Sequence, residues 1–278
     1  MRFLFVGTRS LVILLTVCMI GLSACQPVTP VATEPAAPAP AQPTEITVFA
    51  PSALAEATKL LGAGFEATQP DVKVLFEIGH TPTQRTQIEE GATPDVLMTA
   101  GRADIDALVE KNLVTADQIK GLARNQLILI LPPGNAANIA APADLARPGV
   151  RLLIAAPDLP VGMATQKLLE NLSAAVAPDF KEKALANVVS NELGVKPIVS
   201  KISLGEADAG IVYLTDAVAA PALATLPIPP EANVTVAFML APLAGTANPD
   251  LANAFVAYVL SDEAQAMLQA QGFLPAKP

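Results

Sequence analysis

The residues that could perform chemistry are few, and the sequence does not assemble them into a catalytic group. The chain of 278 residues has one histidine, His80, and lacks the G-x-S-x-G, H-E-x-x-H and Gly-rich phosphate-binding motifs. Nucleophilic catalysis requires a nucleophile with a base within hydrogen-bonding reach, and no such pair is evident. Asp104 and Asp106 are two residues apart, which directs their carboxylates to different faces of a helix. We therefore predict no catalytic residues and interpret this pair as the solvated start of a helix.

Metal coordination and disulfide formation are also disfavoured by the residue types present. The two cysteines, Cys18 and Cys25, both lie close to the N-terminus. His80 has no companion cysteine or histidine at a spacing that suits a metal ion. We therefore expect neither a metal site nor a cofactor. We expect His80 to be solvated or hydrogen-bonded in a polar loop, with contact to a bound anion as the alternative.

The N-terminal residues have the composition of an export signal. Arg2 and Arg9 accompany an apolar stretch over residues 11–22 that is too short to span a membrane as a helix. The Leu-Ser-Ala-Cys sequence at residues 22–25 resembles the bacterial lipobox, in which the cysteine receives a lipid. We predict a lipoprotein signal peptide over residues 1–24 and lipidation of Cys25, with an ordinary signal peptide as the alternative.

The lipidated cysteine is expected to be followed by a tether, so that residues 25–44 form a separate part of the chain. This segment is dominated by Pro, Ala, Thr and Val and has a single charge, at Glu34. Such a composition cannot bury a core and favours extended polyproline II segments. We interpret it as a semi-rigid spacer that lifts the globular part away from a membrane.

The formal net charge of −9 at pH 7 argues against nucleic acid as a partner. Removal of residues 1–24, which contain two arginines and no acidic residue, would leave a charge of −11. The sequence also has no run of basic residues that could attract an anionic membrane surface. We therefore expect the lipid, and not charge, to hold the protein at a membrane.

Short apolar runs alternate with helical patterns from residue 45 onward, which is typical of βαβ units in an α/β protein. Ser52 precedes apolar residues at helical spacing, so Ser52 or a neighbour is expected to cap a helix. Asn248 and Pro249 suit the N-cap and first position of a helix that reaches Leu260, and Ser261 opens another. Strands are predicted at residues 46–49, 72–78, 96–98, 127–131, 151–155, 209–212 and 234–240, and a further helix at residues 83–90.

The order of these elements predicts two lobes. Residues 45–125 together with 234–278 would form lobe I, and residues 126–233 would form lobe II. Small ligands commonly bind in clefts between two such lobes.

Five segments, in order along the chain, carry a family resemblance. They are Ile-Thr-Val-Phe-Ala at 46–50, Gln-Ile-Glu-Glu-Gly-Ala-Thr-Pro-Asp-Val at 87–96, Gly-Glu-Ala-Asp-Ala-Gly-Ile-Val-Tyr at 205–213, Asp-Ala at 216–217 and Gly-Phe-Leu-Pro at 272–275. Together they resemble the periplasmic molybdate-binding proteins of ABC transporters, in the type II periplasmic-binding-protein superfamily. The resemblance implies a two-lobed α/β fold in which each lobe is a mostly parallel sheet flanked by helices, with a ligand cleft between the lobes.

The resemblance also implies how a ligand is held. Proteins of this family bind a dehydrated oxyanion through hydroxyl groups and backbone N–H groups. Such neutral donors at helix N-termini attract an anion without an arginine, so the mode of binding suits an acidic protein.

In the first lobe, the resemblance places ligand contacts at two loops. The family has a serine directly before a leucine, whereas here Ala53 occupies that position and Ser52 lies one residue earlier. Thr81 takes the place of the second hydroxyl residue, within a segment where the family has a run of serines. His80 and Pro82 depart from that run, and Pro82 has no backbone N–H to donate. These departures concern ligand selectivity more than fold.

In the second lobe, the resemblance implies contacts from two backbone N–H groups and one phenol. Val161, in Pro-Val-Gly at 160–162, would donate its N–H from the start of a helix, and Val195 would do the same. Tyr213 takes the place of a tyrosine whose hydroxyl reaches the anion. An aromatic side chain packed at the end of a strand is the alternative interpretation of Tyr213.

These features predict a solute-binding lipoprotein of an ABC importer that binds molybdate or tungstate and is not an enzyme. A monomer would close over its ligand by a hinge and dock on an ABC permease. One alternative keeps the fold but changes the ligand to sulfate, phosphate, a phosphonate or a small organic acid. Another is a surface enzyme or adhesive lipoprotein built on the same scaffold.

Overall fold

The strands of this protein join into one mixed sheet, seen in a computed structural model that describes residues 43–277. The strand order in this nine-stranded sheet is β2, β1, β3, β9, β4, β7, β5, β6, and β8 pairs additionally with β4. The strands are β1 (Thr44–Pro51), β2 (Val72–Gly79), β3 (Val96–Ala100), β4 (Lys120–Leu131), β5 (Leu152–Ala155), β6 (Val188–Glu192), β7 (Ala209–Tyr213), β8 (Ala224–Leu226) and β9 (Thr235–Pro242).

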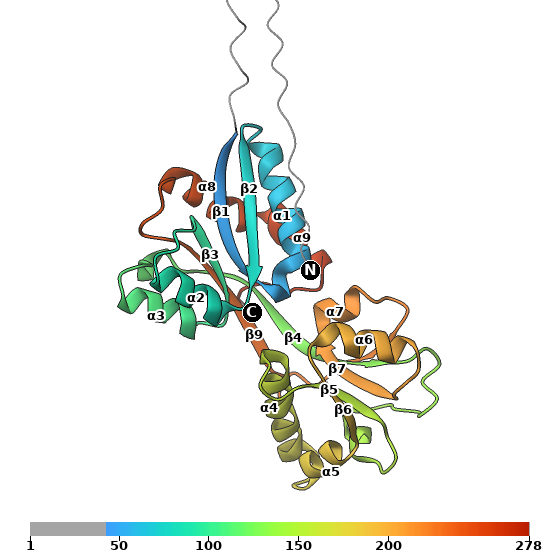
Figure 1. Ribbon diagram of the computed structural model, residues 1–278. Helices are drawn as coiled ribbons and strands as arrows, with labels where there is room; N and C mark the ends of the chain where they lie inside the picture. The colour runs from blue at the N-terminus through green and yellow to red at the C-terminus, as the bar shows by residue number, and fades with distance from the viewer. Residues whose placement is uncertain (1–42, 278) are drawn as a thin grey trace, which may run out of the picture. The chain divides into compact units, whose positions relative to one another are not determined.

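Strand direction differs between the edges and the middle of the sheet (Figure 1). β1 runs parallel to β2 and β3, and β5 runs parallel to β6 and β7. β4 and β9 are antiparallel to each other and to their other neighbours. The predicted α/β class is confirmed, but the sheet is more mixed than expected because two long strands connect its parallel groups. We call β1, β2, β3, β9 and β4 up to Gln126 the A half, and β4 from Leu127 onward with β5 to β8 the B half.

Helices follow most of the strands. The α-helices of the described residues are α1 (Ala55–Thr68), α2 (Thr81–Glu89), α3 (Ala103–Glu110), α4 (Pro160–Ala175), α5 (Phe180–Ala186), α6 (Val195–Ser203), α7 (Leu214–Val218), α8 (Pro249–Val259) and α9 (Asp262–Ala270). Short 3-10 segments are η1 (Ser52–Leu54), η2 (Ala116–Gln118) and η3 (Pro142–Ala146).

Strand alternation sends neighbouring side chains of the A half to opposite faces of the sheet. Val48 and Ala50 are buried in a cluster that includes Phe255 of α8. Phe49, which lies between them, is buried in a second cluster with Ile105 of α3. Helices α1, α8 and α9 therefore cover one face of this half, and α2 and α3 cover the other.

A third buried cluster belongs to the B half. All of its buried members lie between residues 127 and 232, and the other two clusters contain no buried residue from that range. Helices α4, α5 and α6 contribute to this third cluster. Residues from Gln42 onward nevertheless form one compact unit.

All seven predicted strands are present, but β4 begins at Lys120 and not at residue 127. Its part before residue 127 contains Arg124, Asn125 and Gln126, and these polar residues interrupt the apolar pattern that predicts a strand. β6 and β8 were not predicted, since β6 ends in polar residues and β8 has only three residues.

The prediction that Ser52 or a neighbour caps the helix after β1 is wrong. The chain first makes the η1 turn, so the N-cap of α1 is Leu54, which provides no capping side chain. Ser52 instead donates its hydroxyl proton to the carbonyl of Gly79, at an oxygen–oxygen distance of 3.1 Å. The serine thus joins two loops and caps no helix.

Other helix starts follow the sequence closely. Asn248 and Ser261 are the N-caps of α8 and α9, as predicted. Asp104 and Asp106 lie in the first turn of α3 and pair with different cations, Arg85 and Arg102. The helix start is confirmed, with Asp106 half exposed, whereas the Asp104 side chain is only 19% exposed beside Arg85.

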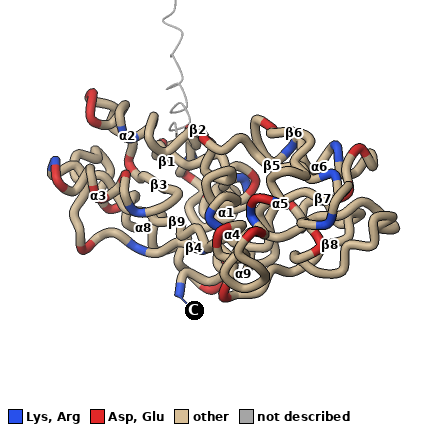
Figure 2. Tube along the Cα trace, turned by 90° about the horizontal axis from the view of Figure 1, so that it is seen from below, with Lys and Arg blue, Asp and Glu red and all other residues tan. Residues whose placement is uncertain are grey.

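Charged residues are dispersed over the described part of the chain. Figure 2 shows Lys and Arg interspersed with Asp and Glu along most elements. Among the helices described here, none has both the length and the apolar character required to cross a bilayer. The predicted signal peptide, the lipidation site Cys25 and most of the predicted tether lie outside the described residues.

Candidate functional site

Two strands of the A half end side by side and bring two of the predicted loops together. β1 and β2 are parallel in a register that pairs Pro51 with Gly79. Ser52 and His80 therefore begin the next segments as neighbours, and the bond from Ser52 to the Gly79 carbonyl fixes them. Ser52, Ala53 and His80 are exposed at this edge. We call Ser52, Ala53, His80 and Thr81 the A group.

Thr81 is the first residue of α2, and its side chain is buried. Its hydroxyl oxygen accepts a hydrogen bond from the backbone N–H of Ala100, at 3.2 Å. Because the hydroxyl accepts this bond, its own proton remains available for donation to a ligand. His80 is the N-cap of α2, and its imidazole makes no hydrogen bond with any described residue.

Gln84 is bonded to the ends of the two strands that precede the A group, although it was not predicted as a site residue. Its side-chain amide donates to the carbonyls of Ala50, at 3.2 Å, and of Glu77, at 2.8 Å. A Cβ atom on Gly79 would lie 3.2 Å from the Gln84 Nε2, so the glycine allows this close approach. The sequence gives little signal for Gln84, because a glutamine in a helix is usually exposed.

Three parallel strands of the B half also end at a common edge. β5 pairs with β6 and β7, and the register aligns Ala155 with Glu192. Helices α4, α6 and α7 begin just beyond these strand ends. Val161, Val195 and Tyr213 occupy the second, first and N-cap positions of those helices, respectively. We call these three residues the B group.

The start of α4 packs tightly against the loop that precedes it. Pro160 is the first residue of the helix, and Val161 is buried. A Cβ atom on Gly162 would lie 1.9 Å from the carbonyl oxygen of Ala156, so only glycine fits this position. The glycine therefore lets the start of α4, with the N–H of Val161, lie close to Ala156.

Tyr213 is buried, with 8% of its surface exposed, and it forms no side-chain hydrogen bond with the described residues. Burial, and to a smaller extent the neighbouring Asp216 charge, raises the pKa of Tyr213 to about 12. The phenol therefore remains protonated at neutral pH and can donate a hydrogen bond to an anion.

Asp216 is an acidic residue directly beside this phenol. Burial raises the pKa of Asp216 to about 6, opposed by a hydrogen bond from the backbone N–H of Tyr213 and by the charge of Lys196. The N–H to carboxylate distance is 3.2 Å. No role was predicted for Asp216, although it belongs to one of the segments that carry the family resemblance.

The charge of Lys196 acts on one carboxylate in each half. It is exposed at the second position of α6, directly after Val195. In the A half, the pKa of Glu56 is lowered first by a hydrogen bond from Lys59 and, among smaller effects, by the charge of Lys196. The same lysine acts on Asp216 in the B half.

Three of the helix N-termini at the predicted site share an electrostatic property, and α7, with Asp216 in its first turn, does not. In α2, α4 and α6 no N-cap side chain forms a capping hydrogen bond, and no acidic residue occurs in the first turn. The first N–H groups of a helix have no partner within the helix and carry a partial positive charge. An anion is the ligand that such groups favour.

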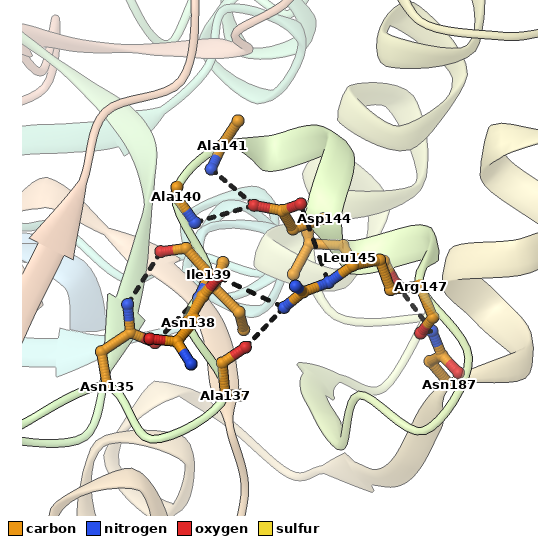
Figure 3. A network of polar contacts seen from close by, with 10 residues as sticks. All are labelled: Asn135, Ala137, Asn138, Ile139, Ala140, Ala141, Asp144, Leu145, Arg147 and Asn187. Atoms are coloured by element: carbon orange, nitrogen blue, oxygen red, sulfur yellow. Dashed lines mark hydrogen bonds and ion pairs between the residues drawn. The ribbon is translucent and has the colours of Figure 1, made fainter.

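Two open cavities lie elsewhere in the B half, and no predicted site residue lines either of them. The first has a volume of about 320 Å³ and lies beside the loop that follows β4. In this loop, Arg147 donates to the carbonyls of Ala137 and Asn138, and Asp144 accepts from two backbone N–H groups (Figure 3). These polar groups bond one another, so we interpret the network as one that stabilises the loop.

The described residues contain no group of three or more His, Cys, Asp or Glu side chains arranged to hold a metal ion. The donors of the two groups are hydroxyls and backbone N–H groups, which suit an anion and not a cation.

Comparison with known proteins places this arrangement in a family. The model of the family described as bacterial extracellular solute-binding protein matches residues 46–274. The molybdate-binding protein ModA of Mycobacterium tuberculosis (strain ATCC 25618 / H37Rv) is 33% identical over 263 residues, which cover 93% of this chain and 94% of that protein. The molybdate-binding protein ModA of Haemophilus influenzae is 27% identical over 82% of this chain and 89% of its own.

A more distant relative is described as a candidate ABC transporter substrate-binding lipoprotein, YvgL, of Bacillus subtilis. It is 21% identical over 82% of this chain and 85% of its own length.

Solved structures share the fold at low sequence identity. A substrate-binding domain assigned to a molybdenum ABC transporter of Clostridium difficile has a TM-score of 0.74 and 23% identity, covering 84% of this chain and 99% of that one. The sulfate-binding protein SubI of Mycobacterium tuberculosis H37Rv has a TM-score of 0.68 and 23% identity, covering 84% and 88%. PEB3 with bound L-phospholactate has a TM-score of 0.66 and 17% identity, covering 82% and 99%.

The family model covers most of the chain, and the M. tuberculosis relative is similar over nearly the full length of both proteins. This chain belongs to the bacterial extracellular solute-binding protein family.

Proposed function

We propose that this protein is the solute-binding component of an ABC importer and that its ligand is molybdate or tungstate. The observation that carries this proposal is the set of uncapped, acid-free N-termini of α2, α4 and α6 at the predicted ligand positions. A tetrahedral oxyanion would accept hydrogen bonds from these N–H groups and from the hydroxyls of Thr81 and Tyr213. The molybdate-binding relatives in two genera support this choice of ligand.

Neutral donors are sufficient for this task in a chain with a formal charge of −9. Thr81 has its hydroxyl oxygen bonded to Ala100, and Tyr213 is protonated at neutral pH, as any phenol is, with burial raising its pKa further to about 12. Each donor is therefore oriented or protonated before a ligand arrives. Preorganised donors lose little entropy on binding, which favours tight binding of a small rigid anion.

We further propose that residues 45–125 with 234–278 and residues 126–233 form two lobes that close over the ligand. One buried cluster lies within residues 127–232 and the other two lie outside that range, which supports this division. Closure would bring Ser52, Ala53 and Thr81 of the A group toward Val161, Val195 and Tyr213 of the B group. His80, exposed at the N-cap of α2, is positioned to add a further contact.

The remaining parts of the proposal concern location and partners. A lipid on Cys25 would hold the protein outside the cytoplasmic membrane, and the substrate-binding lipoprotein among the relatives supports this. The closed, ligand-bound monomer would dock on an ABC permease. We propose no catalytic activity, which the relatives named as molybdate-binding proteins support.

A second candidate is the same fold with a different small anion or organic acid as ligand. Two points favour it. His80 and Pro82 depart from the run of serines that the family resemblance implies at the start of α2. Solved structures of the same fold include sulfate-binding and L-phospholactate-bound proteins. A change of donors in one loop would change the size and protonation state of the anion that fits.

The first test is isothermal titration calorimetry of the chain from Gln26 onward, freed of bound ligand, with molybdate, tungstate, sulfate and phosphate. We expect one molybdate or tungstate per chain and no heat from the other two anions. Binding of sulfate or phosphate alone, or of none of the four, would overturn the molybdate assignment. A screen with small organic acids would then test the second candidate.

Two substitutions test the residues. We expect Thr81→Ala and Tyr213→Phe each to weaken molybdate binding about tenfold or more, since each removes a buried donor worth on the order of 1 to 3 kcal/mol. Thr86→Ala in the same helix and Tyr258→Phe, the only other tyrosine, are matched controls that should leave the affinity unchanged. Equal affinities for the site variants and wild type would reject these two contacts.

A further inference from the structure

Strand β4 changes its partner at one position. Its residues as far as Gln126 pair with β9, where Gln126 lies opposite Thr235. From Leu127 onward, β4 pairs with β7, and Leu127 lies opposite Tyr213. The junction between the A and B halves is therefore one residue away from the strand position of the predicted ligand tyrosine. In Figure 1, β4 passes from one half to the other at this junction.

Asn125 stands at the junction with its side chain fully buried. Its amide oxygen accepts a hydrogen bond from the backbone N–H of Gln126 at 2.9 Å. Its amide nitrogen donates to the hydroxyl oxygen of Thr215 at 3.0 Å. Both ends of the Asn125 amide are thus engaged, one with β4 itself and the other with α7.

Asn233 reaches the same junction but makes a different set of bonds. Its side chain accepts from the backbone N–H of Leu127 at 3.1 Å and donates to the carbonyl of Leu127 at 2.9 Å. It also accepts from its own neighbour, Val234, at 2.8 Å. Asn233 therefore joins the second crossing segment to β4 and has no bond to α7.

Thr215 connects Asn125 to the B group. It is the second residue of α7, whose N-cap is Tyr213 and whose third residue, Asp216, accepts from the Tyr213 N–H at 3.2 Å. The same turn also contacts the A half, because a Cβ atom on Gly272 would lie 3.3 Å from the Thr215 Cα. A displacement of the first turn of α7 must therefore change the Asn125–Thr215 bond or move Asn125 with it.

We propose that Asn125 is a positioning residue that couples ligand contact at Tyr213 to the strand junction through Thr215. The coupling rests on the proposed function, since it requires a ligand that engages Tyr213. Ligand binding draws the first turn of α7 toward the anion, and the Asn125–Thr215 bond transmits this movement to β4 where it passes between the halves. Asn233 holds the same junction without this connection.

The experiment compares Asn125→Ala and Thr215→Val with the matched control Asn233→Ala. The chain from Gln26 onward contains the whole compact unit and no cysteine, so spin labels can be attached at Ala63→Cys in α1 and Glu182→Cys in α5. Label-to-label distances are measured without ligand and with molybdate. Calorimetry gives the affinity of each variant, and urea unfolding gives its stability.

We expect Asn125→Ala and Thr215→Val to broaden the ligand-free distance distribution and to weaken molybdate binding about fivefold or more. The double variant should bind molybdate no more weakly than the single variant with the lower affinity, because both substitutions remove the same Asn125–Thr215 bond. Asn233→Ala should lower stability while its affinity stays within about twofold of wild type, because the Asn233 side chain bonds to Leu127 and Val234 and not to α7.

Two results would overturn the coupling. One is a Thr215→Val variant with wild-type distances and affinity; this variant keeps the bond between Asn125 and Gln126, and Thr215 is only partly buried, so it should fold. The other is an Asn233→Ala variant that loses as much affinity as Asn125→Ala. If wild type binds no anion, the proposed function fails, while the ligand-free distances still decide whether the bond constrains the junction.

Discussion

The N-termini of α2, α4 and α6 differ from those of α3, α8 and α9. The first three have no acidic residue in the first turn and no capping side chain. The second three all have acidic residues there, and Ser261 caps α9 by accepting from the N–H of Ala264. Acidic residues near a helix N-terminus stabilise a protein by about 0.3 to 1 kcal/mol each.

The difference indicates where the chain forgoes helix stability. At α3, α8 and α9 the partial positive charge is neutralised by the protein itself, which completes the helix. At α2, α4 and α6 it is left for another negative group, and these are the helices that follow β2, β5 and β6 at the predicted ligand positions. An acidic residue can therefore be added to a helix of the first set, or a cap removed from α9 in the second set, and the effects on anion binding compared.

The largest effect is expected from Gly162→Ala at the start of α4. Its Cβ atom would lie 1.9 Å from the Ala156 carbonyl oxygen, so the helix start or the preceding loop must move. We expect a loss of about 2 kcal/mol or more in the free energy of unfolding, measured with urea, together with weaker anion binding.

Gly245→Ala is the control for this substitution, because no atom lies within 4 Å of the position that its Cβ would take. It should change stability by less than about 0.5 kcal/mol. Equal stabilities for the two variants would show that the start of α4 does not depend on its glycine.

Asp216 in α7 is an exception, since it is an acidic residue in the first turn of a helix at the predicted site. Burial raises its pKa to about 6 from an ordinary value of 3.8, so the folded protein holds this proton more tightly than the unfolded chain. The resulting stability is fully present below about pH 4 and is lost as the pH rises through about 6.

Asp216→Asn keeps an oxygen that can accept from Tyr213 but cannot ionise. We expect it to be more stable than wild type by on the order of 2 kcal/mol at pH 8 and equally stable at pH 3.5, because one pKa unit corresponds to about 1.4 kcal/mol. Urea unfolding of both proteins across this pH range measures the difference. A difference that does not vary with pH would contradict the assignment.

Thr83→Asp converts the start of α2 to the type found at α3. Thr83 is exposed at the third position of the helix. The new carboxylate should stabilise the helix by about 0.3 to 1 kcal/mol, yet weaken anion binding about tenfold by occupying the positive end of the helix. The same charge further along, in Thr86→Asp, should have little effect on binding. If calorimetry finds the same molybdate affinity for Thr83→Asp and wild type, the N-terminus of α2 does not bind the anion.

The strands were predictable where short apolar runs stand between helical patterns. They were not predictable where a strand contains polar residues, as β4 does at the junction between the two halves. Residues 127–131 form an apolar run that predicts a strand, but the polar residues Asn125 and Gln126 interrupt the apolar pattern before it. Asn125 is polar because its side chain forms hydrogen bonds at the junction. Ser52 was misinterpreted for a related reason. A serine before a helical pattern usually caps it, and here a tertiary bond to Gly79 took precedence.

The candidate site was predictable only through a family resemblance. Nothing in the local sequence distinguishes Val161 or Val195 from other apolar residues, because their expected contribution is a backbone N–H and not a side chain. Gln84 and Lys196 depend on contacts between segments far apart in the chain, and no local pattern encodes such contacts. Asp216 differs, because its bond from the Tyr213 N–H spans only three residues.

The smallest effect is expected from Ser261→Ala, which converts α9 to the uncapped type. The bond from the Ala264 N–H to the Ser261 hydroxyl is long, at 3.4 Å, so its loss should cost about 0.5 kcal/mol, the low end for an N-cap. Asp262 and Glu263 remain in the first turn and continue to neutralise the positive end of the helix. Anion affinity should therefore be unchanged, because an uncapped N-terminus that keeps its acidic residues gains no attraction for an anion. A new weak anion site in Ser261→Ala, detected by calorimetry with molybdate, would show that loss of the cap is enough to attract an anion even where acidic residues remain in the first turn.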